Sequence, residues 1–311
     1  MRRAPLPAPL PGLEPGSPRD QVQVRLHGHP DRQPITFLYL PGLHGDWTLL
    51  GPLRRALGGC ACLVEVAYPC RSDWTLADYA RSVLEEVTRV GAGPCWILGE
   101  SYSSQVAWEL LAQLAARTSP VASSGSPAPA TPAAGFSAAG LILVGGFVRH
   151  PWPWGVDLLG YVSSVAPAWF VGCACRAYAA LAGWRSGAGG GVPSASPEAA
   201  CFAELELFVR RRADPADRRA INSRYRLIRQ SDPRPGARAA RLPVYQLSGF
   251  WDPLVPWWQV RRWLRRDCPG YIATRVVAGA GHNVLLGAAE ESARQILEWS
   301  QAVPSPPFRA A

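Results

Sequence analysis

The sequence predicts an α/β fold in which a mostly parallel sheet carries helices on both faces. Strand-like and helical segments alternate along most of the chain, as in proteins built from β-α-β units. Most of the strand-like runs are continuously apolar, which is typical of strands buried on both faces. With 311 residues, of which 48% are hydrophobic and 18% charged, the chain is long enough for one large domain with an insertion.

The predicted strands and helices follow one another in a regular order. Apolar or alternating runs predict strands in "VQVRLHGH", "ITFLYLPG", "CACLVEVAYP", "CWILG", "LILVGGF", "PVYQLSG" and "ATRVVAG". Helices are predicted in "DWTLLGPLRRALG", "TLADYARSVLEEVTRVG", residues 103–117, "WWQVRRWLRR" and "AEESARQILEWSQ". The first strand alternates polar and apolar residues, so we expect one of its faces to be exposed.

Three segments depart from this order. Residues 1–20 are Pro-rich and predict a disordered tail, and residues 118–139 are low-complexity Pro, Ala and Ser, which predicts a flexible surface insertion. Residues 151–240 are rich in Trp and Gly and then in Arg, and we expect them to form a helical cap, or lid, over the strand ends. The predicted core therefore comprises residues 21–150 and 241–304.

The segment "WILGESYSSQVAWELL" turns from a predicted strand to a predicted helix at Ser101. A sharp turn of this kind needs small side chains two positions before and after its centre, where Gly99 and Ser103 stand. It exposes the central hydroxyl and points the helix N-terminus at developing negative charge. Ser101 is therefore a candidate nucleophile, although a serine here can also be an ordinary N-terminal residue of a helix.

A serine nucleophile needs a base and a carboxylate that orients the base. Of the five histidines, His282 follows the last predicted strand on a Gly-rich loop, and Asp252 follows the preceding strand in the same way. We expect both side chains to meet Ser101 at the carboxyl edge of the sheet. Structural roles are the alternatives. Asp252 can be a turn residue while Asp232 orients the histidine, and His282 can be a hydrogen-bonded structural histidine.

Four motifs in this order resemble those of enzymes with the α/β-hydrolase fold: "LPGLHGDW", "LGESYSSQVA", "LSGFWDPLVP" and "GAGHNVLL". More narrowly, the chain resembles a bacterial group of serine hydrolases with an L-P-G-L-x-G oxyanion loop and a G-E-S-x-S nucleophile elbow. The resemblance covers residues 34–116, 140–150 and 241–300, and it implies a sheet of the eight-stranded type. It also implies an oxyanion hole of two backbone N–H groups, those of Leu43 and Tyr102, whose side chains are then free to shape an acyl pocket.

The predicted function is that of a serine hydrolase, similar to carboxylesterases and thioesterases. Its catalytic triad of Ser101, Asp252 and His282 would cleave a carboxylic ester or thioester through an acyl-enzyme. The reaction implies no metal and no organic cofactor. Two other functions stay open: a lyase or C–C hydrolase with the same triad, and a non-catalytic binding protein on the same fold.

Two residues beside the predicted site have alternative roles. Glu100 precedes the nucleophile and points sideways in such a turn, so we expect a structural ion pair or hydrogen bond rather than acid–base chemistry. His44 lies in the oxyanion loop, where it either contacts substrate or faces solvent.

Ser103 replaces the glycine of the usual G-x-S-x-G pattern, and we expect a close contact between helix and strand there.

The net charge of +9 is compatible with acidic partners. A helix near "DPADRRAINSRYRLIRQSD" carries Arg218, Arg219, Arg224, Arg226 and Arg229 mostly away from its apolar residues; it is either a solvated face or a docking surface for an acidic acyl-carrier protein. Nucleic acid is not an expected partner, because no nucleic-acid-binding motif occurs. The uncharged run at 158–175 predicts an apolar lid over an acyl site, with a membrane span or transient membrane contact as alternatives.

Cysteine usage and the N-terminus predict a cytoplasmic protein. No C-x-x-C pair occurs, and the two C-x-C pairs have no matching His cluster for zinc. Cys60, Cys62 and Cys95 lie in or beside apolar runs, where we expect reduced thiols. The first residues include two arginines but no apolar stretch, unlike a secretory signal.

Overall fold

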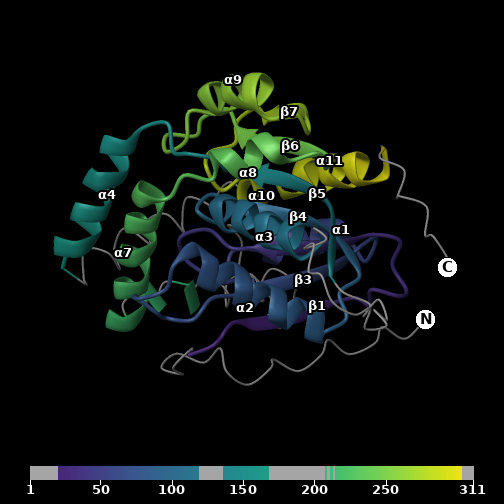
Figure 1. Ribbon diagram of the computed structural model, residues 1–311, viewed down its shortest axis with the longest axis horizontal. Helices are drawn as coiled ribbons and strands as arrows, with labels where there is room; N and C mark the ends of the chain where they lie inside the picture. The colour runs from purple at the N-terminus through teal and green to yellow at the C-terminus, as the bar shows by residue number, and fades with distance from the viewer. Residues whose placement is uncertain (1–19, 119–135, 168–206, 209–210, 213, 303–311) are drawn as a thin grey trace, which may run out of the picture.

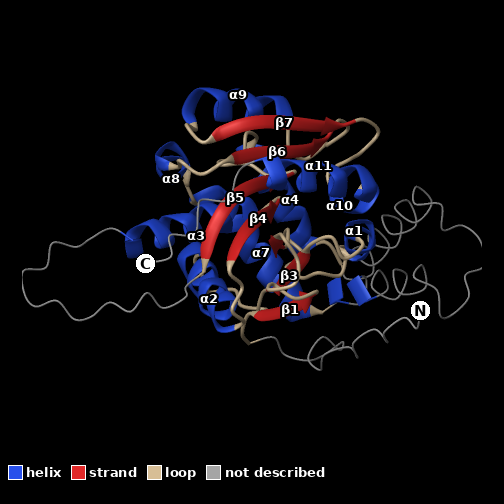
Figure 2. Cartoon of the chain, turned by 90° about the vertical axis from the view of Figure 1, so that its right-hand side faces the viewer, coloured by secondary structure: helices blue, strands red, loops and turns tan. Residues whose placement is uncertain are grey.

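The fold is built on a twisted sheet that runs through the middle of the molecule (Figures 1 and 2). The computed structural model describes residues 20–118, 136–167, 207–208, 211–212 and 214–302. Within them the strand order is β1-β3-β2-β4-β5-β6-β7. The strands are β1 (Gln23–His27), β2 (Thr36–Leu40), β3 (Cys62–Ala67), β4 (Pro94–Glu100), β5 (Ser137–Val144), β6 (Val244–Gly249) and β7 (Tyr271–Val277).

The prediction of a mostly parallel sheet is confirmed. Every neighbouring pair is parallel except β1 and β3, which are antiparallel. Each strand overlaps one of the predicted strand segments, and β4, β5 and β7 begin before the segments predicted for them. The described residues form a 7-stranded sheet rather than one of the eight-stranded type.

Helices cover both faces of the sheet, as Figure 2 shows. On one face α1, α10 and α11 contact one another, and on the other face α2 contacts α3, which in turn contacts α8. Helix α9 packs against β6 and β7. These helices are α1 (Gly51–Leu57), α2 (Leu76–Arg89), α3 (Ser103–Thr118), α8 (Arg234–Ala239), α9 (Trp257–Asp267), α10 (Val284–Gly287) and α11 (Ala289–Ala302).

The alternation of side chains along a buried strand explains the two-sided core. In β2, Phe37 and Tyr39 pack into the cluster formed with α1 and α11, whereas Leu38 and Leu40 pack into the cluster formed with α2 and α3. Because both faces are apolar, all five residues of β2 are buried. The continuous apolar run in the sequence is the direct consequence.

The boundaries of the predicted insertion at 118–139 need correction at its C-terminal end. Strand β5 begins at Ser137, because residues from Ser137 onward pair with β4, starting opposite Pro94. Three residues of the predicted insertion therefore belong to the sheet. Residues 119–135 lie outside the described residues, as do the predicted tail at 1–19 and the chain after residue 302.

The strand order places a crevice between the ends of β2 and β4. These two strands are parallel neighbours, with Leu40 opposite Gly99, and the chain leaves β2 and β4 towards opposite sides of the sheet. Ligand sites of open α/β sheets lie at such a reversal, outside the carboxyl ends of the strands. The loop after β2 and the turn after β4 therefore meet at one place.

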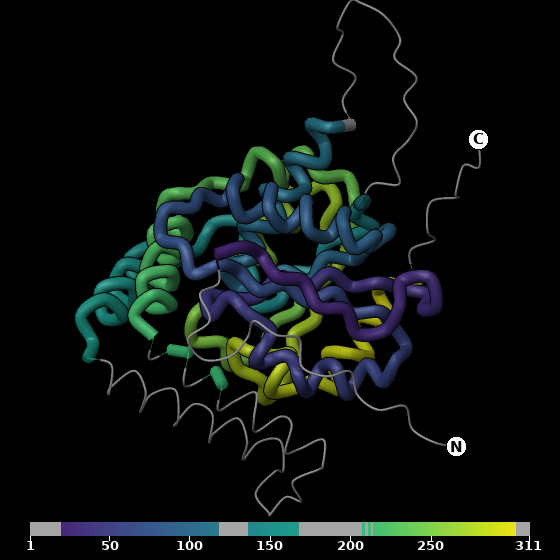
Figure 3. Tube along the Cα trace, turned by 90° about the horizontal axis from the view of Figure 1, so that it is seen from below, coloured from purple at the N-terminus to yellow at the C-terminus, as the bar shows by residue number. Residues whose placement is uncertain are grey.

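Two further helices lie beside this end of the sheet. Helix α4 (Pro153–Val165) and helix α7 (Pro215–Gln230) contact each other and lie side by side in Figures 1 and 3. The described part of the apolar run at 158–175 is the C-terminal half of α4 and the two residues after it, and residues 168–175 fall outside the described part of the chain. None of the described helices is both long and apolar enough to cross a membrane.

Candidate active site

Ser101 occupies the strained centre of the turn between β4 and α3. Its φ of 49° is the one positive φ among the non-glycine residues that the structure describes. Its N–H donates to the carbonyl of Val144 at 2.9 Å, which fixes the turn to the end of β5. A non-glycine residue in this conformation costs about 1–3 kcal/mol and persists only where the surrounding structure imposes it.

Small side chains make this turn possible, as the sequence predicted. A Cβ added to Gly99 would lie 3.1 Å from Ser104 Cα, closer than ordinary packing allows. Ser103 is fully buried, and its hydroxyl donates to the carbonyl of Pro41. Since that bond uses the hydroxyl hydrogen of Ser103, Tyr68 donates its own to Ser103 Oγ at 2.7 Å. Ser103 therefore joins α3 to the end of β2.

The structure brings His282 and Asp252 to Ser101. His282 Nε2 lies 2.9 Å from Ser101 Oγ, and His282 Nδ1 lies 2.8 Å from Asp252 Oδ2. Gly145, with a φ of 52°, follows β5 and lies under the histidine; a Cβ there would come within 3.0 Å of the His282 carbonyl and 3.4 Å of its ring. The backbone after β5 thus leaves room for the ring to reach across the sheet edge.

Asp252 also fulfils the turn role considered as its alternative. Its Oδ1 accepts hydrogen bonds from the N–H groups of Leu254 and Val255, both at 2.9 Å. One carboxylate oxygen therefore closes the turn while the other faces His282. The other acidic candidate, Asp232, binds Arg234 instead.

The environment of His282 raises its pKa above the ordinary value. Burial by itself lowers the pKa, but the hydrogen bond and the charge of Asp252, with a smaller effect of Glu100, outweigh it. In the neutral form Nδ1–H donates to Asp252 and Nε2 accepts from the Ser101 hydroxyl. This arrangement is that of a general base beside a hydroxyl nucleophile.

Two free backbone N–H groups lie in the turn after β4 and in the loop after β2. The N–H groups of Leu43 and Tyr102 donate to no acceptor among the described residues. The carbonyl of Leu43 accepts from Arg224 at 2.8 Å. Unoccupied N–H donors beside a nucleophile are what a developing oxyanion requires.

Comparisons with known proteins give a similar fold but no close relative. No protein-family model and no curated protein sequence matches the chain. The fold is similar to an esterase from Thermogutta terrifontis, with a TM-score of 0.63 and 16% identity over 90% of this chain and 93% of that chain. It is also similar to the esterase RhEst1 from Rhodococcus sp. ECU1013, with a TM-score of 0.60 and 17% identity over 91% and 95%. A third similar fold is that of an enol-lactonase from Burkholderia xenovorans LB400, with a TM-score of 0.59 and 14% identity over 90% of this chain and 96% of that chain.

The chain has the α/β-hydrolase fold. Within it Ser101 directly follows β4, Asp252 lies in the loop after β6, and His282 lies in the loop after β7. Because the identities lie between 14% and 17%, the similarity shows the fold alone.

The side chain of Tyr102 corrects one expectation for this α/β-hydrolase site. It does not shape the acyl pocket; it is fully buried in the core, with ring contacts to Tyr68 and Tyr79. The reason is that a side chain directly after the turn points towards α2 rather than along the sheet edge. Leu43 does line the cavity beside Ser101.

Glu100 has the structural role predicted for it. Its Oε2 accepts hydrogen bonds from the Tyr39 hydroxyl and, at 3.4 Å, from the N–H of Gly42. Burial, and to a smaller extent the charge of Glu100 and the hydrogen bond to it, raises the pKa of Tyr39. Glu100 therefore fixes the start of the loop that carries Leu43.

His44 lines the cavity and does not face bulk solvent. Its Nε2 is buried and has no partner among the described residues. Burial lowers the pKa of His44, and the charges of Arg212 and Arg224 lower it further against the opposing effects of Glu100 and Asp46. A neutral ring with an unused nitrogen at the cavity wall is suited to contact a substrate.

The cavity at Ser101 has a volume of about 290 Å³ and a mainly apolar wall. It is enclosed by the loops after β2 and β5 and by α4 and α7. Its apolar lining includes Leu43, Phe147, Val156, Leu159, Ile221 and Leu254. The part of the chain that the structure describes contains no group of three or more His, Cys, Asp or Glu residues arranged to hold a metal ion.

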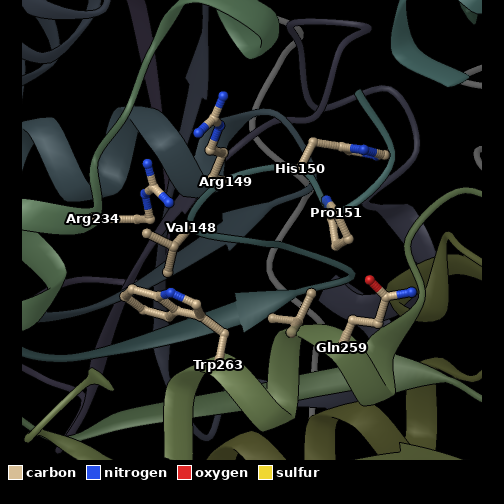
Figure 4. Close-up of a pocket in the computed structure, with 8 residues that line it drawn as sticks. Val148, Arg149, His150, Pro151, Arg234, Gln259 and Trp263 are labelled. Atoms are coloured by element: carbon tan, nitrogen blue, oxygen red, sulfur yellow. The ribbon is translucent and has the colours of Figure 1, made fainter. Parts of the chain in front are cut away.

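A second cavity of about 220 Å³ adjoins the first one and shares His150 with it. Figure 4 shows Arg149 and Arg234 on one side of it and Trp263 and Gln259 of α9 on the other. Burial is the main cause that lowers the pKa of His150 to about 4, and its Nδ1 accepts from the N–H of Trp152 at 3.1 Å. His150 is therefore a neutral wall between the two cavities.

Sequence reasoning missed the arginines that support the loop after β2. Arg224 was expected on or near the solvated side of its helix, but it is fully buried and donates to the carbonyls of Leu43 and Pro69. Arg212 donates to the carbonyl of His44 at 2.7 Å and pairs with the buried Asp46. One signal was available: Asp46 is the one acidic residue of the otherwise apolar and glycine-rich segment "LPGLHGDW".

Proposed function

We propose that this chain is a serine hydrolase that cleaves a carboxylic ester or thioester through an acyl-enzyme. The supporting observation is the continuous hydrogen-bonded series from Ser101 Oγ through His282 to the buried carboxylate of Asp252. A bacterial group with an L-P-G-L-x-G loop and a G-E-S-x-S elbow is the narrower class we assign it to. The esterase names among proteins of similar fold agree with this proposal.

The mechanism follows from the geometry of the three side chains. Ser101 Oγ attacks the carbonyl carbon while His282 Nε2 takes its proton, and Asp252 stabilises the resulting imidazolium. The N–H groups of Leu43 and Tyr102 bind the oxyanion, each contributing about 3 kcal/mol. His282 then protonates the leaving group, and water activated by the same nitrogen releases the acid from Ser101.

The cavity favours an apolar acyl group. Its wall carries Leu159 of α4 and Ile221 of α7, and the positive charge of Arg218 is held by the carbonyls of Ser163 and Ala166. We therefore infer that α4 and α7 act as the cap over the site and that the substrate presents its hydrocarbon part to them. Burial of each methylene there contributes about 0.8 kcal/mol to binding.

Labelling by a fluorophosphonate probe tests the nucleophile. The wild-type protein should be labelled, and Ser101→Ala should abolish labelling without changing the melting temperature. A matched variant, Ser72→Ala, removes an exposed hydroxyl that lies outside the proposed mechanism and should keep the label. Labelling that persists in Ser101→Ala contradicts the proposal.

Turnover separates the proposed reaction from the other two functions. Hydrolysis of short-chain p-nitrophenyl esters and of acyl thioesters would support the hydrolase. Product analysis would reveal a lyase or C–C hydrolase instead. Absence of any reaction with esters, thioesters and the probe would favour a binding protein.

An acidic acyl-carrier protein is a further proposed partner, for which the exposed Arg219 and Arg226 of α7 are the contact residues.

A further inference from the structure

A row of exposed aromatic rings lies beside the candidate site. Trp251 is 67% exposed, and Phe250 and Trp258 are each 49% exposed. Ring contacts join them in series: Phe250 to Trp251 at 5.0 Å, Phe250 to Trp257 at 6.4 Å, and Trp257 to Trp258 at 5.8 Å. Isolated exposed aromatics are common on protein surfaces, but three exposed rings joined by the half-buried Trp257 indicate an interaction site.

The backbone beneath these rings is held in place. The N–H of Phe250 donates to the carbonyl of Val277 at 3.0 Å, and the N–H of Trp251 donates to the carbonyl of Ala280 at 2.9 Å. Trp257 and Trp258 begin α9, which packs its buried Val260 and Leu264 against the core. The rings therefore project into solvent from fixed elements.

Arginines extend the aromatic row along α9. Trp258, Arg261, Arg262 and Arg265 follow the spacing i, i+3, i+4, i+7 and so occupy one face of the helix, opposite Val260 and Leu264. An open groove of about 530 Å³ runs along this face, lined by both tryptophans and by these arginines together with Arg266.

The positive charge on this face is largely uncompensated. Arg261, Arg262 and Arg265 are exposed and pair with no carboxylate among the described residues. The one acidic residue of α9, Asp267, pairs with Arg238 and Arg266 at the end of the helix. The face therefore combines exposed indoles with free guanidinium groups.

We propose that this α9 surface, formed by Phe250, Trp251, Trp257, Trp258, Arg261, Arg262 and Arg265, docks on an anionic phospholipid membrane. Indole rings prefer the headgroup level of a bilayer, and arginines on the same face bind the lipid phosphates. The aromatic rings and the arginines of the surface would therefore both contact the headgroup region of the bilayer.

The α9 surface lies next to the cavity at Ser101, so docking there would bring the cavity close to the membrane. Leu254 is partly exposed beside this surface and also lines the cavity at Ser101, and Phe250 and Trp251 directly precede Asp252. A protein bound through these rings would hold the cavity near the lipid, from which an apolar acyl substrate could enter. An acidic protein partner would satisfy the arginines but would not need three exposed rings.

Vesicle sedimentation tests the proposal without any turnover. The full chain with Ser101→Ala is mixed with vesicles of phosphatidylcholine alone or of phosphatidylcholine and phosphatidylglycerol. We expect binding to the anionic vesicles only, and we expect it to weaken when salt is raised from about 0.1 M to about 1 M, where charge screening becomes short-ranged. Since catalysis is not measured, the result is independent of the proposed hydrolase function.

Two sets of variants locate the contact. The triple change Arg261→Gln, Arg262→Gln and Arg265→Gln should weaken binding by about 100-fold, and Trp258→Gln should weaken it by about tenfold. The matched control changes three exposed arginines of α2 and α11, with the same loss of charge: Arg81→Gln, Arg89→Gln and Arg294→Gln. It should weaken binding by less than about threefold, because these charges lie off the surface.

Each contrary result overturns the proposal. Equal losses in both triple variants would mean that net charge, and not the α9 surface, attracts the vesicles. Absence of binding to anionic vesicles would exclude membrane docking. If the protein instead bound an acidic acyl-carrier protein and lost that binding in the α9 triple variant, the surface would belong to a protein partner. All variants should keep their melting temperature, which shows that lost binding is not lost folding.

Discussion

At the scale of single residues, Asp252 uses its two carboxylate oxygens for different tasks. Oδ1 closes the turn after β6, and Oδ2 accepts from His282. Asp252→Asn keeps the shape but offers an amide in place of the acceptor, so the imidazole loses its tautomer and its charge stabilisation. We expect kcat to fall by about 10⁴-fold.

The same substitution should change the pH profile. In the wild-type protein, kcat/KM should rise with pH as His282 loses its proton, with a midpoint above the ordinary histidine pKa of about 6.5, because Asp252 raises the pKa of His282. In Asp252→Asn the midpoint should move to lower pH, since burial alone lowers the pKa. The rate of fluorophosphonate labelling against pH measures both midpoints, with Asp232→Asn as the control. An unchanged midpoint would contradict the assignment of Asp252.

Ser103 shows why this elbow departs from the usual glycine. Its hydroxyl donates to the Pro41 carbonyl and accepts from Tyr68, so it satisfies two buried groups. Ser103→Ala should lower the free energy of unfolding by about 1–3 kcal/mol, because both groups lose their partner. Urea unfolding measures the change.

A double-mutant cycle with Tyr68→Phe identifies the cause. Once the phenol hydroxyl is removed, Ser103→Ala leaves only the Pro41 carbonyl unsatisfied and should cost less than in the wild-type protein. Strictly additive costs would mean that the two hydroxyls do not interact.

At the scale of elements, α7 supports the loop after β2 from outside the sheet. Arg224 lies against Gly45, where an added Cβ would come within 2.2 Å of its guanidinium, and it donates to the carbonyl of Leu43. The N–H of that same residue is one of the two proposed oxyanion donors. The position of the loop after β2 therefore depends on the position of α7.

Arg224→Met should misplace this donor while keeping much of the side-chain volume. Loss of a whole oxyanion donor lowers kcat by about 10²–10³-fold, so a displaced one should lower it by roughly 10–100-fold. We expect KM to change less than kcat, and the protein to be destabilised as well. Arg226→Met, at an exposed position of the same helix, is the matched control. A wild-type kcat in Arg224→Met would show that the loop holds its position without α7.

The elements differ in how well the sequence predicts them. Continuous apolar runs identified the central strands, because burial on both faces removes polar residues from them. The start of β5 at Ser137 was hidden, since its first residues resemble the small-residue insertion before it. The three residues of the candidate triad were predictable because each lies just beyond a strand, in the turn or loop that follows it. The inward direction of Tyr102 and Arg224 was not, because it depends on neighbours that are distant in sequence.

At the scale of the whole molecule, one buried carboxylate joins the antiparallel edge of the sheet to the helix layer. Glu65 of β3 is fully buried; it pairs with Arg25 of β1 at 2.6 Å and with Arg54 of α1 at 2.5 Å, and it also contacts His27. Burial raises the pKa of Glu65, but the hydrogen bond from His27 and the charges of both arginines outweigh it, so the net pKa is lowered. Three elements therefore depend on this charge.

Stability should accordingly depend on pH through Glu65. A lowered folded-state pKa stabilises the fold above the unfolded-state value of about 4.3, and this contribution is lost as the pH falls towards the folded-state pKa. Glu65→Gln should lower the free energy of unfolding at pH 7 by about 3–5 kcal/mol, because Arg25 and Arg54 lose the charge of this buried carboxylate. With this substitution, the free energy of unfolding should also fall less steeply as the pH drops below about 4. Urea unfolding across this range measures both effects, with the exposed Glu85→Gln as control. A decline as steep in Glu65→Gln as in the wild-type protein would place the acid sensitivity in other carboxylates.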